Sequence, residues 1–393
     1  MNKYTAPSLL LMIVLVAFPQ ISETIYTPSL PDIAVALGAS NSSVQLTLSI
    51  YFIGFALGVF CWGWLSDFIG RRPAMLGGLI VYGIGSLMCF YAESITFLLV
   101  SRFIQAFGAA TGSVITQTIL RESLSGSKRH AMFAQISAVI AFTPAIGPLI
   151  GGWVDEALGF KAVFCVLIIM SILLFIYAYC KLPETTNVST RKRIAIYPVV
   201  KRIISSPQVV VFGLVIGGIN GILFSYYAEA PFIFIEHFHI SPGLYGFLGI
   251  VVALASIFGA MISKKLVSIW QPEKIIHLGC CVMTIGSLLL TLVTTVAILP
   301  NIVLMISILT FIFILLLGAG IALPNCLSLA LVNFQDVVGT AGAIFSLGYY
   351  LLVSLVTFGM SFLHNGSLYT MPLYFLIMSI IMWALGKKYI LTS

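Results

Sequence analysis

Charged residues are scarce in this chain. Only 8% of its 393 residues are Asp, Glu, Lys or Arg, whereas 60% are hydrophobic. A soluble domain carries roughly a quarter charged residues. So few charges cannot cover a surface that faces water, so lipid must be the solvent. The composition therefore excludes an ordinary soluble protein and predicts an integral membrane protein.

Motifs for catalysis, nucleotide hydrolysis and metal binding are also missing. The sequence contains no G-x-x-x-x-G-K-[ST] loop and no H-E-x-x-H or G-x-S-x-G motif. The seven cysteines lie in or beside apolar runs without metal-type spacing, and we interpret them as small packing residues. His237 and His239 lie on a short predicted loop, where solvated histidines are more common than a metal site. We therefore expect no enzyme, no metal and no cofactor.

Energy for any active process must then come from an ion gradient. One proton that crosses about 100 mV releases about 2.3 kcal/mol, which supports a solute gradient of roughly 50-fold.

Apolar runs of the length that crosses a bilayer recur along the whole chain. A hydrocarbon core about 30 Å thick needs roughly 20 residues of helix. The runs predict an all-α integral membrane protein with twelve transmembrane helices. The predicted spans are residues 7–28, 43–65, 74–92, 95–119, 131–153, 160–181, 208–234, 243–267, 273–297, 301–328, 339–363 and 370–389.

The basic residues predict the orientation of these spans. If the N-terminus is inside, all of the 19 Lys and Arg residues except Arg102 and Lys161 fall in cytoplasmic segments. The positive-inside rule then predicts that both termini are cytoplasmic, and an even number of spans agrees, because it puts both ends on one side. The net charge of +7 faces the inner membrane surface in this arrangement, so we expect no nucleic-acid partner.

One polar segment, residues 182–207, divides the chain into two halves. It contains the basic cluster 191–193 and separates a predicted N-terminal six-helix bundle, residues 1–181, from a C-terminal one, residues 208–393. Six plus six spans with a cytoplasmic linker indicate two bundles that move against each other around a site near the bilayer midplane.

The loop between the second and third predicted spans carries the most specific motif. Gly63 permits close helix contact, Gly70 permits a tight turn, and Asp67 lies at the membrane boundary. Arg71 and Arg72 meet the anionic leaflet or pair with Asp67. The pattern G-x-L-x-D-x-x-G-R-R resembles the signature loop of the major facilitator superfamily. The resemblance implies a major facilitator fold, in which Asp67 and Arg71, with Arg72, close the cytoplasmic side.

The fourth predicted span contains a cation. A buried Arg costs roughly 3 kcal/mol at mid-bilayer, so Arg102 should face a partner or a water-filled cavity unless it snorkels to the surface. Gln105 lies one helical turn further and can share its network. The segment resembles the R-x-x-Q-G element of drug:proton antiporters, with Ala106 in place of Gly. The resemblance implies a role for Arg102 in proton coupling.

The fifth predicted span contains glycines and prolines at helical spacing. Gly147 and Gly151 form a G-x-x-x-G face for close helix approach, followed by Gly152, and Pro144 and Pro148 can kink the helix. The segment resembles the antiporter element that separates exporters from importers in the superfamily. The resemblance therefore implies export.

The first predicted span contains a carboxylate among apolar residues. Charging Glu23 there is expensive, so burial favours uptake of a proton, which suits a proton carrier. The segment resembles the D-x-Y-x-P-x-x-P signature of the bicyclomycin/chloramphenicol-resistance (Bcr/CflA) branch, with Tyr26, Pro28 and Pro31 matching. The acid lies one position before the usual one, which is Thr24 here, and the side chain is therefore turned by about 100°. Glu23 either carries the proton or faces an outer vestibule.

The seventh predicted span contains a second acid, Glu229, also a few residues before a proline. It is a further candidate for proton coupling, but a cation site or a place in the outer interface is equally open. Polar and aromatic residues within the spans are candidates for the substrate cavity, although packing is the alternative for each tyrosine. These candidates are Tyr26, Tyr51, Gln105, Tyr227, Asn325, Tyr349 and Tyr350.

The combined interpretation is a twelve-helix drug:proton antiporter that exports small amphipathic organic molecules by alternating access. We expect a monomer in a bacterial inner membrane, with the substrate, protons and lipid as its partners. A dedicated metabolite or siderophore carrier, exporter or importer, is the main alternative. A channel or a receptor that transports nothing is a further one.

Overall fold

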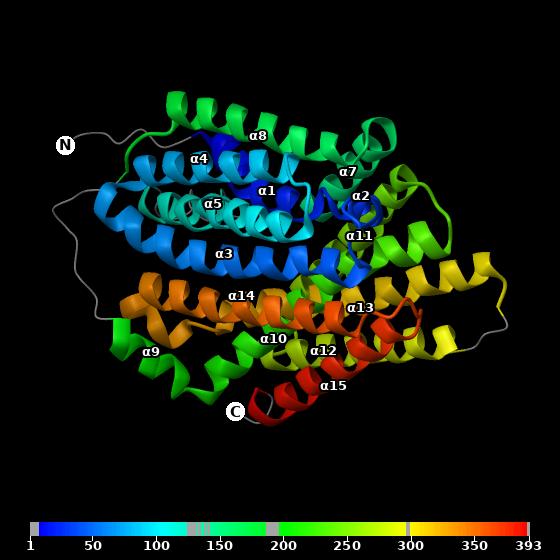
Figure 1. The fold of residues 1–393 in the computed structure, drawn as a ribbon. Helices are drawn as coiled ribbons and strands as arrows, with labels where there is room; N and C mark the ends of the chain where they lie inside the picture. The colour runs from blue at the N-terminus through cyan, green and yellow to red at the C-terminus, as the bar shows by residue number, and fades with distance from the viewer. Residues whose placement is uncertain are drawn as a thin grey trace. The chain divides into compact units, whose positions relative to one another are not determined.

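The computed structural model describes residues 8–123, 132, 135–136, 139, 142–185, 196–295 and 299–390, and the regular structure in these ranges is helical (Figure 1). The chain forms two compact units. The first comprises residues 1–194 with 242–246, and the second comprises residues 195–241 with 247–393. Each unit is described by itself.

The helices follow one another with short connections. In the first part of the chain they are α1 (Leu9–Thr24), η1 (Thr27–Ser29), α2 (Leu30–Ala36), α3 (Asn41–Ile69), α4 (Arg71–Phe90), α5 (Ile95–Ser123), α7 (Thr143–Leu158) and α8 (Phe160–Lys181). In the second part they are α9 (Ile196–Ile204), α10 (Pro207–Pro231), η3 (Phe232–His237), α11 (Pro242–Leu266), α12 (Pro272–Thr295), α13 (Asn301–Leu329), η4 (Val332–Val337), α14 (Val338–Leu363) and α15 (Thr370–Tyr389).

Within the described ranges, 11 helices are long and apolar enough to cross a membrane. They coincide with eleven of the twelve predicted spans. The remaining one, residues 131–153, lies partly outside the described residues, and its second half is α7. The fold class predicted from the sequence, an all-α membrane protein, is therefore confirmed.

The first predicted span is not one continuous helix. Its α-helix ends at Thr24, a short 3₁₀ segment follows, and α2 continues to Ala36. Pro28 and Pro31 lack the N–H groups that an uninterrupted helix would use, which explains the break. Glu23 therefore lies in the last turn before a bend.

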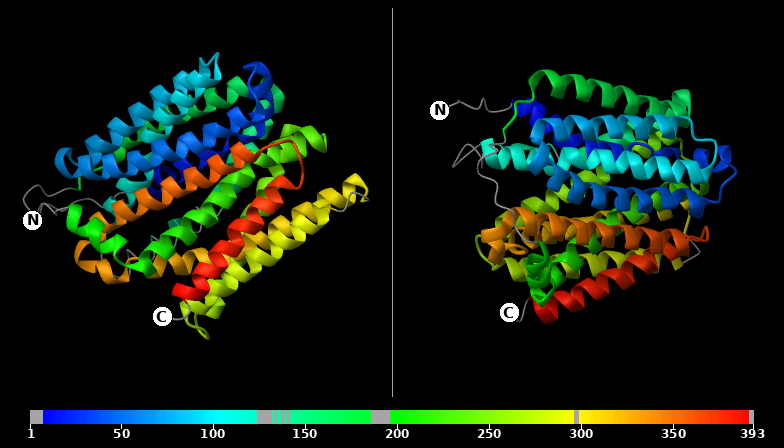
Figure 2. Two further views of the ribbon diagram at one scale, coloured as in Figure 1. Left: turned by 60° about the horizontal axis from the view of Figure 1, so that its bottom comes forward. Right: turned by 60° about the vertical axis from the view of Figure 1, so that its left-hand side comes forward.

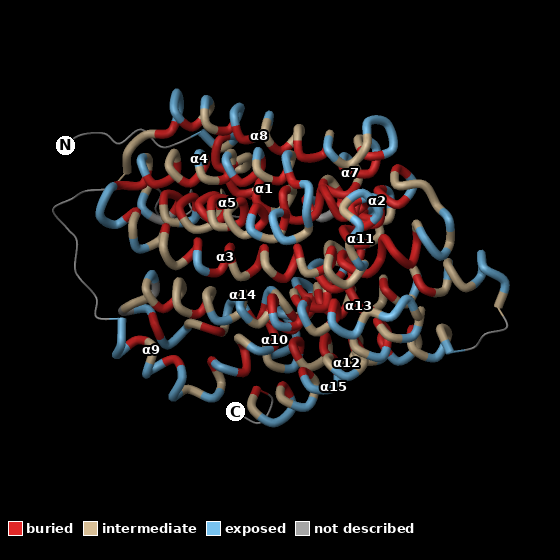
Figure 3. Tube along the Cα trace, viewed as in Figure 1, coloured by how far each residue is buried: buried red, intermediate tan, exposed pale blue. Residues whose placement is uncertain are grey.

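Helix α5 lies at the centre of the first unit, where it packs against α3, α4 and α1. Glycines allow these close approaches, because a Cβ atom at Gly54 would strike the carbonyl oxygen of Phe103, and one at Gly85 would strike the backbone of Gln105. Figure 3 shows the buried side of these helices in red. Helix α8 exposes apolar side chains such as Ile172, which is 52% exposed and suited to lipid contact.

In the second unit, α10 packs against α14 and α15, and α12 packs along α13 (Figure 2). At Pro231 helix α10 passes into the π-helix η3. Such π-helical turns are rare and frequently occur at functional sites.

Candidate gate and proton-coupling site

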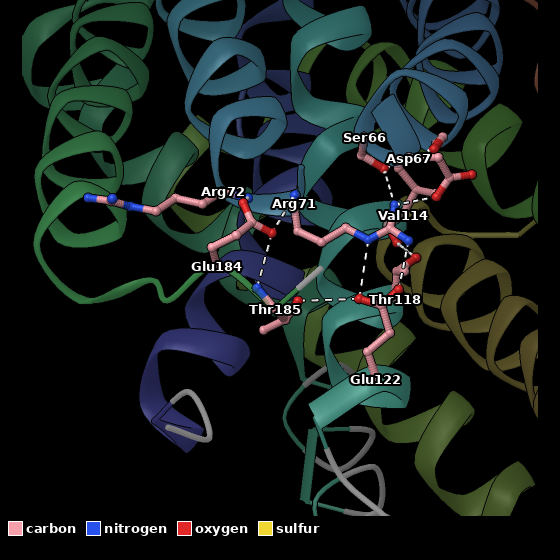
Figure 4. Close-up of polar contacts among 10 residues, drawn as sticks. Ser66, Asp67, Arg71, Arg72, Val114, Thr118, Glu122, Glu184 and Thr185 are labelled. Carbon is pink, nitrogen blue, oxygen red and sulfur yellow. Dashed lines mark hydrogen bonds and ion pairs between the residues drawn. The ribbon is translucent and has the colours of Figure 1, made fainter. Parts of the chain in front are cut away.

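The signature loop is built around Gly70. Its φ of 102° lies in a region that favours glycine, and it both ends α3 and precedes the first residue of α4. This turn brings Asp67, in the last turn of α3, beside Arg71, the first residue of α4. Figure 4 shows both side chains in one polar cluster.

Arg71 connects three helices. Its Nη1 donates to Asp67 Oδ1 at 2.6 Å and to the hydroxyl of Ser66 at 2.7 Å. Its Nη2 and Nε donate to the two carboxylate oxygens of Glu122, at 2.7 and 3.2 Å. This two-point pairing is the strongest geometry for an arginine with a carboxylate. The predicted contact between Arg71 and Asp67 is present, and Glu122 at the end of α5 joins it.

Glu184 holds the start of α4 from another direction. Its Oε1 accepts from the backbone N–H of Arg71 at 3.0 Å, and its Oε2 accepts from that of Arg72 at 3.1 Å (Figure 4). A carboxylate at a helix N-terminus satisfies free N–H groups and interacts favourably with the helix dipole. The segment after α8 is thereby tied to the signature loop.

The Arg72 side chain turns away from this cluster. It donates to the backbone oxygen of Tyr179 at 2.7 Å, and its guanidinium lies 5.4 Å from the centre of the Tyr179 ring. Arg72 therefore joins α4 to the end of α8, whereas Arg71 makes the ion pairs.

Sequence reasoning missed Glu122 and Glu184. A signal for Glu122 was present, because it follows a predicted span that ends on the same side of the membrane as Asp67. Glu184 lies in the linker, and its contact with the loop more than 100 residues earlier leaves no local pattern in the sequence.

Arg102 lies in the interior of the first unit and is fully buried. Its guanidinium carbon lies 3.9 Å from the ring centre of Tyr26 and 4.3 Å from that of Tyr51. Its Nη1 donates to Gln105, whose own amide donates to the hydroxyl of Ser86 at 2.8 Å. The alternative in which Arg102 snorkels to the surface is therefore wrong. Two aromatic faces and an amide hold the cation instead.

The other edge of the Arg102 guanidinium is unused. Its Nε and Nη2 are buried and have no hydrogen-bond partner among the described residues. Two adjacent N–H groups on one edge of a guanidinium match the two oxygens of a carboxylate. The buried Glu23 in α1, 5% exposed, lies close enough for its charge to interact with that of Arg102.

The predicted antiporter element packs directly against the bend that carries Glu23. A Cβ atom at Gly147 would strike the side chain of Thr24, and one at Gly151 would strike the backbone oxygen of Ile25. Backbone contact this close is possible only for glycine. A shift of α7 would therefore displace the residues next to Glu23. Pro148 and Gly152 are buried in the same helix, and the Pro144 side chain lies outside the described residues.

The remaining cavity candidates have varied surroundings. The Tyr26 hydroxyl shares a hydrogen bond of 2.9 Å with Thr47, and Tyr227 is buried. The Asn325 amide donates to the hydroxyl of Ser263 at 2.7 Å. Tyr349 and Tyr350 are half-buried, with ring centres 4.4 Å apart. Their role in binding a substrate stays a prediction.

Glu229 has a partner that sequence reasoning missed. Both of its carboxylate oxygens lie 2.9 Å from Nδ1 of His364, which follows the last residue of α14. No three His, Cys, Asp or Glu side chains of the described ranges form a group that could hold a metal ion, and His237 and His239 belong to no such group.

Comparisons with known proteins agree with this architecture. A family model described as Major Facilitator Superfamily matches residues 12–357. An uncharacterized transporter of Rickettsia bellii (strain RML369-C) is 34% identical over 94% of this chain and 93% of its own length. A chloramphenicol resistance protein of Pseudomonas aeruginosa is 29% identical over 92% of this chain and 85% of its own length. The crystal structure of a D-xylose-proton symporter has a TM-score of 0.76 at 15% identity, with 97% of each chain covered, a likeness of fold alone.

Proposed function

The chain belongs to the major facilitator superfamily of transporters, and we propose that it exports small amphipathic organic molecules in exchange for protons. One observation carries the proposal: the buried Glu23 lies within electrostatic range of a buried Arg102, whose Nε and Nη2 have no hydrogen-bond partner among the described residues. The chloramphenicol resistance protein among its relatives supports the class of substrate. The proposal includes cytoplasmic termini and an inner-membrane location.

The coupling step follows from the charges of this pair. A deprotonated Glu23 is attracted to the free edge of Arg102, because an unpaired buried carboxylate is strongly disfavoured. Protonation removes that attraction and frees the last turn of α1. The bend after Thr24 and the glycine contacts of α7 pass this change to the neighbouring helix. Proton binding is thereby linked to a change in helix packing.

The Arg71 cluster supplies the second part of the cycle. It ties the ends of α3 and α5 to the start of α4. We assign it to closure of the cytoplasmic side, and its contacts must open when the site faces the cytoplasm. Alternating access then consists of breaking and remaking this cluster once in each cycle.

The test is transport in proteoliposomes with an imposed pH gradient and a panel of compounds that includes chloramphenicol. Wild-type protein is expected to accumulate at least one compound against its gradient, and a protonophore is expected to abolish the accumulation. Glu23→Gln is expected to lose accumulation driven by the pH gradient while it retains exchange of labelled for unlabelled compound. Glu93→Gln is the matched control, because Glu93 is an exposed acid of the same unit.

Full accumulation by the Glu23→Gln variant would refute the assignment of the coupling acid. Flux that does not saturate and persists with the protonophore would indicate a channel. Uptake in the direction of proton flow would indicate an importer.

A further inference from the structure

A buried pair of titratable side chains lies in the second unit, far along the chain from Glu23. Glu229 is in the last turns of α10, and His364 directly follows α14. The Nδ1 atom of His364 lies 2.9 Å from each carboxylate oxygen of Glu229, and the two side chains are only 8% and 3% exposed. The centre of the Phe232 ring lies 5.4 Å from the centre of the imidazole. The pair joins two segments that are 135 residues apart in sequence.

The pair borders a cavity of about 230 Å³, which Glu236 and His237 of η3 also line. A volume of this size can hold water, so protons have access to the pair. Of the elements packed against α10, η3 contributes these two titratable groups. Helices α13 and α15 contribute no lining residue to the described cavity.

The charge state of the pair follows from its burial. A buried carboxylate is stable only with a partner that neutralises it, and an imidazolium is such a partner. Burial by itself lowers the pKa of His364, but the hydrogen bond to Glu229 and the negative charges of Glu229 and Glu236 outweigh it. The pKa of His364 is therefore raised above its ordinary 6.5.

We propose that Glu229 and His364 form a proton-binding site, separate from Glu23, in which a proton on the imidazole ties the end of α10 to the segment after α14. Loss of this proton at alkaline pH removes the positive charge of His364 from beside Glu229 and loosens the tie. The role of the site in transport rests on the proposed orientation, which puts this end of α10 outside. The site therefore makes the transport cycle sensitive to external pH.

The sign of the effect on stability follows from the raised pKa. The pair contributes its full stabilisation below the unfolded pKa of His, about 6.5. This contribution is lost as the pH rises through the higher pKa of the folded state. The wild-type melting temperature should therefore fall over that interval. The double variant Glu229→Gln/His364→Gln, which has no buried charge at this position, should lack this fall.

The direct measurement is NMR titration of purified protein labelled at histidine, in which His364→Gln identifies the resonance among the five histidines. His364 is expected to titrate above 6.5 in the wild type. Its pKa is expected to fall in Glu229→Gln, because burial is then opposed only by the charge of Glu236. His237→Gln is the control, since His237 lines the same cavity but lies outside the pair. A wild-type His364 that titrates at or below 6.5, or that ignores Glu229→Gln, would overturn the proposal.

Titration and melting need no transported compound, so they test this site even if proton antiport proves wrong. Transport in proteoliposomes at varied external pH tests its role in the cycle. The midpoint of the pH profile is expected to shift in Glu229→Gln and in His364→Gln, and to stay in place in His237→Gln. Identical profiles in all four proteins would refute the link to transport. If a single change leaves a buried charge that prevents folding, the double variant Glu229→Gln/His364→Gln replaces the single variants in this assay.

Discussion

We predict that Arg71 interacts more strongly with an acid outside the signature motif than with the acid of the motif itself. The motif contains Asp67, which makes one contact with Arg71 at 2.6 Å and has a side chain that is 58% exposed. Glu122 lies outside the motif, yet it makes two contacts and is only 33% exposed. Water screens the first pair more than the second. Glu122 should therefore be the stronger partner.

The magnitudes can be worked from these exposures. Two unit charges about 4 Å apart interact by about 4 kcal/mol at an effective dielectric constant of 20. One-third exposure of Glu122 reduces this, and hydrogen bonds to charged groups typically contribute about 1.5–3 kcal/mol. We expect a coupling energy of about 1–3 kcal/mol between Arg71 and Glu122. For Asp67, exposed ion pairs give about 0.2–1 kcal/mol.

Two double-mutant cycles measure these energies. One combines Arg71→Met with Glu122→Gln, and the other combines Arg71→Met with Asp67→Asn. Equilibrium unfolding in mixed micelles, followed by tryptophan fluorescence, supplies the free energies. Glu93→Gln, an exposed acid, controls for the loss of a negative charge. A coupling of Arg71 with Asp67 that equals or exceeds the coupling with Glu122 would refute the reasoning.

Three further predictions concern helix contacts. Gly151→Ala pushes a methyl group into the backbone oxygen of Ile25 and should lower stability by about 1–3 kcal/mol in thermal unfolding. Gly386→Ala, where nothing lies within 4 Å of the new atom, should not be destabilising, and equal losses in both variants would contradict the packing argument. Glu184→Gln keeps an acceptor but loses the charge at the start of α4, so it should cost about 0.3–1 kcal/mol. Glu184→Ala should cost up to about 2 kcal/mol, and similar melting temperatures for the two Glu184 variants would argue against a cap. Arg102→Lys keeps the charge but loses the planar group between aromatic rings, which should cost about 2 kcal/mol, whereas unchanged stability would show that the rings contribute nothing.

Much of the fold was predictable because its signal is local. A span of lipid-facing helix must be apolar along its whole length, so hydropathy alone located α8 (Phe160–Lys181) and α15 (Thr370–Tyr389) at the residues observed. The first span was drawn as one helix although it bends after Thr24. Pro28 and Pro31 were a sequence signal for that bend, but hydropathy does not distinguish a bent apolar segment from a straight one.

The candidate site was predictable only in part. Asp67 and Arg71 are four residues apart around a glycine, so their contact follows from short-range geometry. Ion-pair partners that come from distant segments leave no spacing to recognise. Glu122, Glu184 and His364 were missed for that reason, and the surroundings of Arg102 stayed open between burial and the surface.

The sequence by itself determined that the protein lies in lipid, that it is helical and which family it resembles. Each of these follows from residues that are neighbours along the chain. Only the tertiary structure decided which charges meet. The guanidinium of Arg71 pairs with acids of α3 and α5, and that of Arg102 lies against rings from the turn after α1 and from α3. The physical reason is the low dielectric constant of the interior. There a buried charge is stable only beside a fitting partner, and the partner's place is set by helix packing.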